Sequence, residues 1–185
     1  MDDIYIEKVL KGDFNAFQYF VKTYSTFAFS LSFSILKNYH EAEDAVQESF
    51  VKAFKGLASF KRNARFQTWL GKIVINESLK RIKPRKEHLT SSEEFPDNEP
   101  EIMKDSINTL KRNEQTYYIN LVFERLSPNE SIALELFYLK DYSITEIKEM
   151  TGWTDSKTKM LLLRGRKNFY CELKNMLKSE MKELI

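Results

Sequence analysis

The stretch from residue 60 to residue 86, FKRNARFQTWLGKIVINESLKRIKPRK, places the strongest constraint on the fold. It holds nine basic residues and one acidic residue, Glu77, so its net charge is +8. Its apolar residues recur at the spacing of one helical face, which predicts a helix that packs on a core with its cations in water. Cations beside aromatic and amide groups suit single-stranded nucleic acid, because rings stack on unpaired bases. The alternative is a solvated basic helix with Trp69 in the core.

The composition favours an all-α fold. The 185 residues include only 5 Gly and 4 Pro, too few for a loop-rich β protein. The single cysteine, Cys171, permits no internal disulfide and fits a reducing compartment. The chain has no apolar run near the roughly 20 residues that a membrane helix needs, and its acidic N-terminus lacks the layout of a signal peptide. These observations predict a cytoplasmic protein without membrane insertion.

The N-terminal third predicts three helices before the basic stretch. A short helix spans Asp2 to Leu10, a longer one begins at Asp13, and a third runs from Glu41 to about Leu57. The expected buried set of the second helix is Phe14, Phe17, Phe20, Val21, Tyr24, Phe27, Ala28, Leu31 and Ile35. The expected buried set of the third is Ala42, Ala45, Val46, Ser49, Phe50, Ala53, Phe54 and Leu57.

The outer face of the third helix begins acidic and ends basic. This order complements the helix dipole, which alone could explain it. Two functional interpretations stand beside that one. The first is a docking face for a basic partner helix, and the second is a metal site built from His40, Asp44 and Glu48.

The middle of the chain changes character. Residues 89–107 form an acidic linker with two prolines, which separates an N-terminal helical domain, residues 1–88, from a C-terminal domain, residues 108–185. The carboxylates of the linker could shield a basic face, mimic nucleic acid in a basic channel, or only aid solubility. The sequence leaves these three interpretations open.

The C-terminal part predicts a helix-turn-helix. A helix is expected over residues 108–125. Ser127-Pro128-Asn129-Glu130 then opens a helix that carries Ala133, Leu134, Leu136, Phe137 and Leu139. Ser143-Ile144-Thr145-Glu146 opens a short helix that closes at Gly152, and Thr154 or Asp155 caps a long basic helix. In a helix-turn-helix the second helix enters the major groove with its N-terminal residues leading. The exposed candidates are Asp155, Ser156, Lys157, Lys159 and Met160 toward bases, with Arg164, Arg166 and Lys167 toward phosphates.

Taken together, the two halves resemble the extracytoplasmic-function sigma factors, the small two-domain class of bacterial RNA polymerase specificity subunits. The matching segments are AFQYFVKTY after Gly12-Asp13, HEAEDAVQESFVKAF, FKRNARFQTWLGKIVINESLKR, ERLSPNESIALELFYLKDYSITEIKEMTG and KTKMLLLRGRKNF. They cover nearly the whole chain apart from the linker. The resemblance implies a transcription initiation factor that is not an enzyme and needs no cofactor.

The resemblance also implies site residues and partners. The helix with Asp44, Gln47 and Glu48 would bind the clamp helices of the polymerase largest subunit, the flap region of the polymerase would be a further contact, and an anti-sigma factor would hold the protein inactive. The linker would thread the polymerase near its active and RNA-exit channels. The residues implied for the minus-ten element are Phe60, Lys61, Arg62, Asn63, Arg65, Lys72, Asn76, Lys80 and Arg81. Those implied for the minus-thirty-five element are Ser156, Lys157, Lys159, Met160, Arg164 and Arg166.

Three positions depart from the family pattern. Ser156 and Leu161 stand where many members have Gly and Arg at the start of the recognition helix, and Asn63 stands where an acid is common. An amide can donate as well as accept, so base preference can differ. Two other function classes stay open: a stand-alone helix-turn-helix regulator that binds duplex DNA as a dimer, and a metal-dependent nuclease using Glu41, Asp44, Glu48 and His40.

Overall fold

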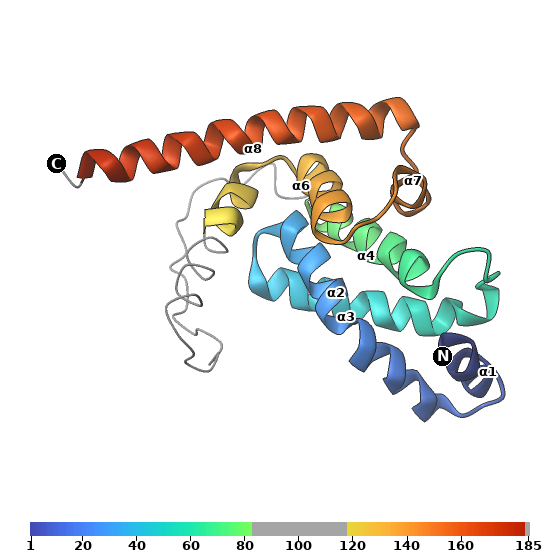
Figure 1. Cartoon of the computed structure of the whole chain (residues 1–185). Helices are drawn as coiled ribbons and strands as arrows, with labels where there is room; N and C mark the ends of the chain where they lie inside the picture. Colours follow the sequence, from blue (N-terminus) through green and yellow to red (C-terminus); the bar gives the residue numbers. More distant parts are fainter. Residues whose placement is uncertain (83–117, 184–185) are drawn as a thin grey trace.

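All regular structure in the described chain is helical. The structure is a computed structural model that describes residues 1–82 and 118–183, with side chains up to Leu177. Within these ranges there is no strand, so the predicted all-α class is confirmed (Figure 1). The predicted linker, its carboxylates and the start of the helix expected over 108–125 lie outside the described residues.

The N-terminal part consists of four α-helices and two short 3-10 turns. These are α1 (Asp2–Leu10), η1 (Phe14–Phe17), α2 (Gln18–Leu36), α3 (Tyr39–Gly56), η2 (Leu57–Ser59) and α4 (Phe66–Ile82). The second helix begins at Gln18, because residues 14–17 form a 3-10 turn and the Asp13 side chain makes no capping hydrogen bond. The third begins at Tyr39, two residues earlier than expected, because the Asn38 side chain accepts a hydrogen bond from the Glu41 amide at 2.9 Å.

Helices α2, α3 and α4 pack around an apolar core. Phe20, Leu31 and Leu70 are fully buried in it. The predicted burial is wrong for three residues: Phe14 is 65% exposed, and Val21 and Phe54 lie on the surface. Phe14 precedes the first α-helical turn of α2, so the spacing of that helix does not apply to it. Its ring instead meets the Phe54 ring edge-on at 5.7 Å between centroids.

The C-terminal part begins with helical residues 118–125. It continues with α6 (Pro128–Leu134), the single π-type turn η4 (Glu135–Leu139), α7 (Ile144–Thr151) and α8 (Asp155–Glu183). Both predicted capping boxes are present, at Ser127 and at Ser143. Leu139, one of the apolar residues of the helix predicted after Ser127, is exposed, because the wider π turn takes its side chain out of the α-helical spacing.

The helices of the helix-turn-helix end and begin at the predicted residues. Gly152 closes α7 with φ +72°, a conformation that glycine adopts without strain. The Thr154 hydroxyl accepts a hydrogen bond from the Lys157 amide and begins α8. Where α8 crosses α6, a Cβ at Gly165 would lie 3.1 Å from Leu134 Cγ, so a side chain there would not fit without movement.

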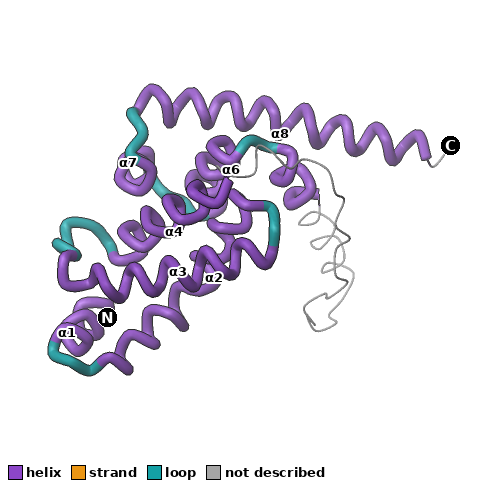
Figure 2. Tube along the Cα trace, turned by 180° about the vertical axis from the view of Figure 1, so that it is seen from behind, coloured by secondary structure: helices purple, strands orange, loops and turns teal. Residues whose placement is uncertain are grey.

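The two halves share one continuous hydrophobic core. Helix α2 packs against α6, and α4 packs against α7. The rings of Phe27 and Tyr142 meet across this boundary at 6.2 Å between centroids. Figure 2 shows from behind that α8 passes over α6 and extends beyond the rest of the protein. The division into domains at residues 88 and 108 stays a prediction.

Candidate nucleic-acid interface

Trp69 lies in an aromatic cluster at the start of α4. Its ring centroid is 4.9 Å from that of Phe60 and 5.5 Å from that of Phe66, and Phe66 is buried. On the other side, Gly56 leaves just enough space: a Cβ there would lie 3.4 Å from Trp69 Cζ2. Trp69 is therefore partly buried, between the core position of one interpretation and the exposed stacking platform of the other.

The loop before α4 surrounds a hollow of about 400 Å³. Its cationic lining includes Lys61, Arg62 and Lys72, and its amide is Asn63. Lys61, Asn63 and Lys72 are exposed to solvent, as is the neighbouring Arg65. The lining residues are Ser59, Phe60, Lys61, Arg62, Asn63, Ala64, Thr68, Trp69 and Lys72, together with Glu149 from α7. The loop thus brings cations, an amide and aromatic edges to one hollow, as the sequence predicts.

Arg62 is held in place within this loop. Its backbone has φ +56°, and its Nη2 contacts the Glu7 carboxylate on α1 at 2.6 Å. A left-handed conformation at a residue with a side chain costs free energy, so the ion pair helps to fix the shape of the loop. Contact with DNA through Arg62 would require the guanidinium to exchange or share this partner.

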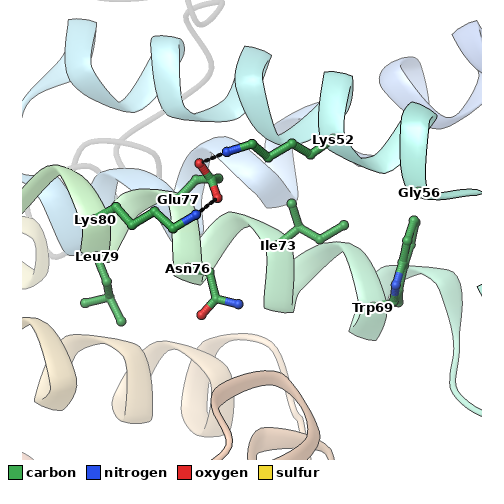
Figure 3. A pocket seen from close by; sticks show the side chains of 8 residues that line it. All are labelled: Lys52, Gly56, Trp69, Ile73, Asn76, Glu77, Leu79 and Lys80. Carbon is green, nitrogen blue, oxygen red and sulfur yellow. Dashed lines mark hydrogen bonds and ion pairs between the residues drawn. The ribbon is translucent and has the colours of Figure 1, made fainter. Parts of the chain in front are cut away.

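A second hollow, of about 520 Å³, lies between α3 and α4 (Figure 3). Glu77 reaches into it and contacts the ammonium groups of Lys52 and Lys80, the latter at 2.8 Å. Burial raises the pKa of the Glu77 carboxyl, but the hydrogen bonds from Lys52 and Lys80 outweigh it, so the pKa lies below its usual value. Asn76 and Leu79 point away from α3. Lys80, whose side chain is 65% exposed, is therefore paired with a buried carboxylate, a contact that the sequence analysis missed.

The acidic face of α3 meets the end of α4. Arg81 places Nη1 3.8 Å from Asp44 Oδ2 and Nη2 3.3 Å from Glu48 Oε2. Glu48 also contacts Lys52 at 3.2 Å. Asp44 and Gln47 are exposed. Arg81, predicted for the minus-ten element, therefore contacts Asp44 and Glu48, predicted for polymerase, so the two predicted sets meet at the end of α4.

The described residues hold no group of three or more His, Cys, Asp or Glu side chains that could bind a metal ion. Asp44 and Glu48, proposed as ligands in the nuclease hypothesis, face Arg81 instead. Among the described residues, no helix is both long enough and apolar enough to cross a bilayer.

The start of α8 presents the predicted reading residues to solvent. Ser156, Lys157, Lys159 and Met160 are all exposed. The Lys157 ammonium lies 5.2 Å from the Trp153 ring centroid, which orients it by a cation–π contact. Leu161, one of the departures from the family pattern, is 2% exposed and packs in the core.

Arg164, whose side chain is 53% exposed, pairs with a buried carboxylate of the C-terminal part. Its Nε lies 2.6 Å from Glu130 Oε1, and Asn168 donates to the same oxygen at 2.9 Å. Glu130 is 3% exposed and also completes the capping box with Ser127. Burial raises the pKa of Glu130, but the hydrogen bonds from Ser127 and Arg164 hold it below its usual value. Arg166 is exposed as well, and no carboxylate is described beside it.

Comparison with known proteins identifies the family. Residues 20–87 match the family model for sigma-70 region 2. The chain is 28% identical to the ECF RNA polymerase sigma factor SigW of Bacillus subtilis over 179 residues, which cover 92% of this chain and 96% of that protein. The chain belongs to the extracytoplasmic-function sigma factors. A shorter match joins this sigma factor to the ECF sigma-E factor of Haemophilus influenzae, with 32% identity over 58% of this chain and 52% of that one.

Two solved structures share the fold of this sigma factor. The sigma factor RpoE in complex with the anti-sigma factor NepR from Bartonella quintana gives a TM-score of 0.67 at 18% identity, over 85% of this chain and 96% of that one. CnrH in complex with the cytosolic domain of CnrY gives 0.61 at 17% identity, over 95% and 96%. At these identities the likeness concerns the helical fold.

Proposed function

We propose that this sigma factor binds core RNA polymerase and directs promoter recognition, DNA melting and transcription initiation, without catalysis of its own and in the cytoplasm. The observation that supports this most is the loop hollow of about 400 Å³, lined by cations, an amide and aromatic rings. Such a hollow suits an unstacked base whose flanking phosphates lie on the cations. Duplex DNA would instead need an element that enters a groove.

The residues proposed for the minus-ten role differ in the contacts that they already make. Lys61, Asn63, Arg65 and Lys72 are exposed and ready for a strand. Phe60 packs on Trp69 and shapes the hollow. The members already engaged in ion pairs are Arg62, Lys80 and Arg81, which would exchange carboxylate partners for phosphates. Asn76 lines the neighbouring hollow between α3 and α4.

The proposed polymerase and minus-thirty-five contacts also use mainly exposed side chains. Asp44, Gln47 and Glu48 on α3 form the proposed docking face for the clamp helices of the polymerase. Ser156, Lys157, Lys159 and Met160 form the proposed minus-thirty-five reader, with Arg166 on phosphates. Arg164 would touch a phosphate only with the nitrogens that Glu130 does not hold. We further propose two domains, residues 1–88 and 108–185, joined by the acidic linker 89–107, and an anti-sigma partner like that named for RpoE.

Promoter-directed transcription tests the proposal. Purified bacterial core polymerase is assayed on a genomic fragment library with and without this protein. Initiation at a defined set of start sites only when the protein is present would support the proposal and give the promoter sequences. Failure to associate with core polymerase, together with tight duplex binding by the protein alone, would favour the stand-alone regulator instead.

Replacing Lys72 with alanine should weaken open-complex formation about fivefold, because one exposed phosphate contact is lost from the loop hollow. The slope of log affinity against log salt concentration should fall by about 0.7, the value for one phosphate of a single strand. The measurement is holoenzyme binding to a promoter fragment from the library at several salt concentrations. Lys22→Ala, an exposed lysine of α2 outside the hollow, is the matched control. Equal slopes for both variants would refute the contact.

A further inference from the structure

Helix α1 lies beside the loop of the proposed minus-ten site, residues 60–65 (Figure 1). It packs on η1 and on η2, the 3-10 turn that leads into this loop. Its buried residues, Ile6 and Val9, belong to the main core. None of the contacts proposed above for polymerase or DNA uses α1, although the helix touches the loop on which the minus-ten contacts depend.

The first turn of α1 is fixed to α2. The Asp2 carboxylate accepts hydrogen bonds from the Tyr19 hydroxyl at 3.0 Å and from the Tyr24 hydroxyl at 2.6 Å. The Tyr5 ring stacks on the Tyr19 ring, with 4.0 Å between centroids. The centroid of the Tyr24 ring is in turn 5.4 Å from that of Phe66, the first residue of α4. Helix α1 is therefore held firmly beside the end of the loop.

From this fixed helix, Glu7 reaches the middle of the loop. Its Oε1 lies 2.6 Å from Arg62 Nη2. Among the described contacts, no other side-chain hydrogen bond or ion pair joins residues 61–65 to the rest of the protein. The hydrogen bond from Arg62 and its charge hold the pKa of the Glu7 carboxyl below its usual value, so the pair is ionised at neutral pH.

The ion pair affects the loop more than it affects the whole protein. The side chains of Arg62 and Glu7 are 38% and 49% exposed, and ion pairs of this kind add little to global stability. The backbone of Arg62, however, has φ +56°, a conformation that costs free energy in a residue with a side chain. Without the pair, Arg62 can relax to an ordinary conformation, and the adjoining Asn63 would move with it.

Two possible roles of Glu7 predict opposite effects of its removal. If Arg62 exchanges Glu7 for a phosphate, the carboxylate competes with DNA, so its loss should tighten binding. If the pair instead holds the loop in shape, its loss should weaken binding, even though the net charge rises by one. A preformed hollow binds more tightly because less chain must be ordered when the base enters.

We propose that Glu7 is a positioning residue for the minus-ten loop: through its ion pair with Arg62, α1 holds the loop in the shape that accepts an unstacked base. The inference rests on the proposed function, since it takes the loop hollow as the place of that base. It also narrows the role of Arg62, which keeps Glu7 as its partner when the strand binds and acts through the shape of the loop.

Glu7→Ala tests this in the full-length protein and in its holoenzyme. In the free protein, backbone amide order parameters of residues 61–64 from NMR relaxation should fall from about 0.85, typical of a rigid backbone, to below about 0.6. The holoenzyme should bind the promoter fragment used for Lys72→Ala about threefold more weakly, as expected for one partly exposed ion pair. The salt slope should not change, because no phosphate contact is lost. The urea midpoint should not change either, whereas a general structural role would lower it.

Three further variants complete the design. Asp3→Ala removes an exposed acid of the same helix that makes no contact in the described part of the chain, so it gives the effect of net charge alone. Arg62→Ala should match Glu7→Ala in every measurement, and the double variant should bind no more weakly than either single variant, since each removes the same ion pair. Lys61→Ala, at an exposed neighbour of Arg62, should instead lower the salt slope by about 0.7.

The outcomes separate this inference from the proposed function. Unchanged order parameters or unchanged affinity in Glu7→Ala would overturn the inference. Tighter binding than for Asp3→Ala would also overturn it, because the carboxylate would then only compete with DNA. So would a salt slope lowered by about 0.7 in Arg62→Ala, which would make Arg62 a phosphate contact. A holoenzyme that initiates at no defined start site would refute the proposed function, and the order parameters would still decide whether α1 holds the loop.

Discussion

Asp44→Lys should weaken binding to core RNA polymerase at least about tenfold and leave the helical fold intact. Reversal of one charge in a close interfacial pair costs about 1.5 kcal/mol or more, which corresponds to that factor. The Asp44 side chain is 66% exposed, and its neighbour Ala45 carries the packing on the inner face of α3. The new ammonium would also lie beside Arg81, which keeps Glu48 as its partner.

Cys171 makes the measurement direct. It is the one cysteine of the sequence and it is exposed, so a fluorophore attached there reports binding as an increase in anisotropy when core polymerase is added. Circular dichroism checks the fold of each variant. Asp13→Lys is the matched control, an exposed acid of the same half outside α3. Equal affinity for both variants would show that α3 is not the docking face.

Glu130→Ala should lower the free energy of unfolding by about 2 kcal/mol. Loss of the capping box accounts for about 1 kcal/mol, and the rest comes from the lost hydrogen bonds of Arg164 and Asn168, a small term because the Arg164 side chain is 53% exposed and water replaces its partner. Glu146→Ala is the matched control, since Glu146 completes the equivalent capping box of α7 without a comparable buried partner. It should cost only about 1 kcal/mol. Urea unfolding followed by circular dichroism measures both, and equal losses would refute the role of the Arg164 contact.

The same carboxylate should make stability sensitive to acid. Its pKa in the folded protein lies below the usual 4.5, so its contribution is present above that value and is lost as the pH falls through the lower folded pKa. The urea midpoint of the unaltered protein should therefore fall more steeply below pH 4.5 than that of Glu130→Ala. Parallel curves for the two proteins would assign the acid sensitivity to other carboxylates.

The sequence predicts the helices well because their signals are local. Apolar spacing and the capping boxes at Ser127 and Ser143 lie within a few residues of the elements that they define. The predicted helix starts and buried residues are wrong where a second local interaction changes the structure. The Asn38 cap begins α3 before Glu41, and the 3-10 turn at Phe14 turns that ring to the surface. The exposed reading residues at the start of α8 were predicted for the same reason.

The buried carboxylates could not be predicted in this way. Glu77 is stabilised by Lys52, which is 25 residues away on another helix, and Glu130 by Arg164, 34 residues away. The sequence around each carboxylate predicts a solvated charge, because its partner comes near only when the helices pack together. The place of Glu149 at the loop hollow depends likewise on the contact of α7 with α4. Polar contacts between distant segments leave no periodic signal.

The length of α8 has a mechanical consequence. Its 29 residues form one helix that is roughly 43 Å long, and the crossing with α6 at Gly165 lies about 15 Å from its reading end. Beyond that crossing, α8 also contacts helix 118–125 through the Phe123–Phe169 rings and the Arg125–Glu172 ion pair, so a force on its far end tilts the helix only when these contacts give way. A tilt of about 5° would displace Ser156 and its neighbours by roughly 1 Å, enough to break a hydrogen bond to a base edge. For the minus-thirty-five role proposed for the start of α8, the C-terminal end of this helix would act as a lever at a distance from any DNA.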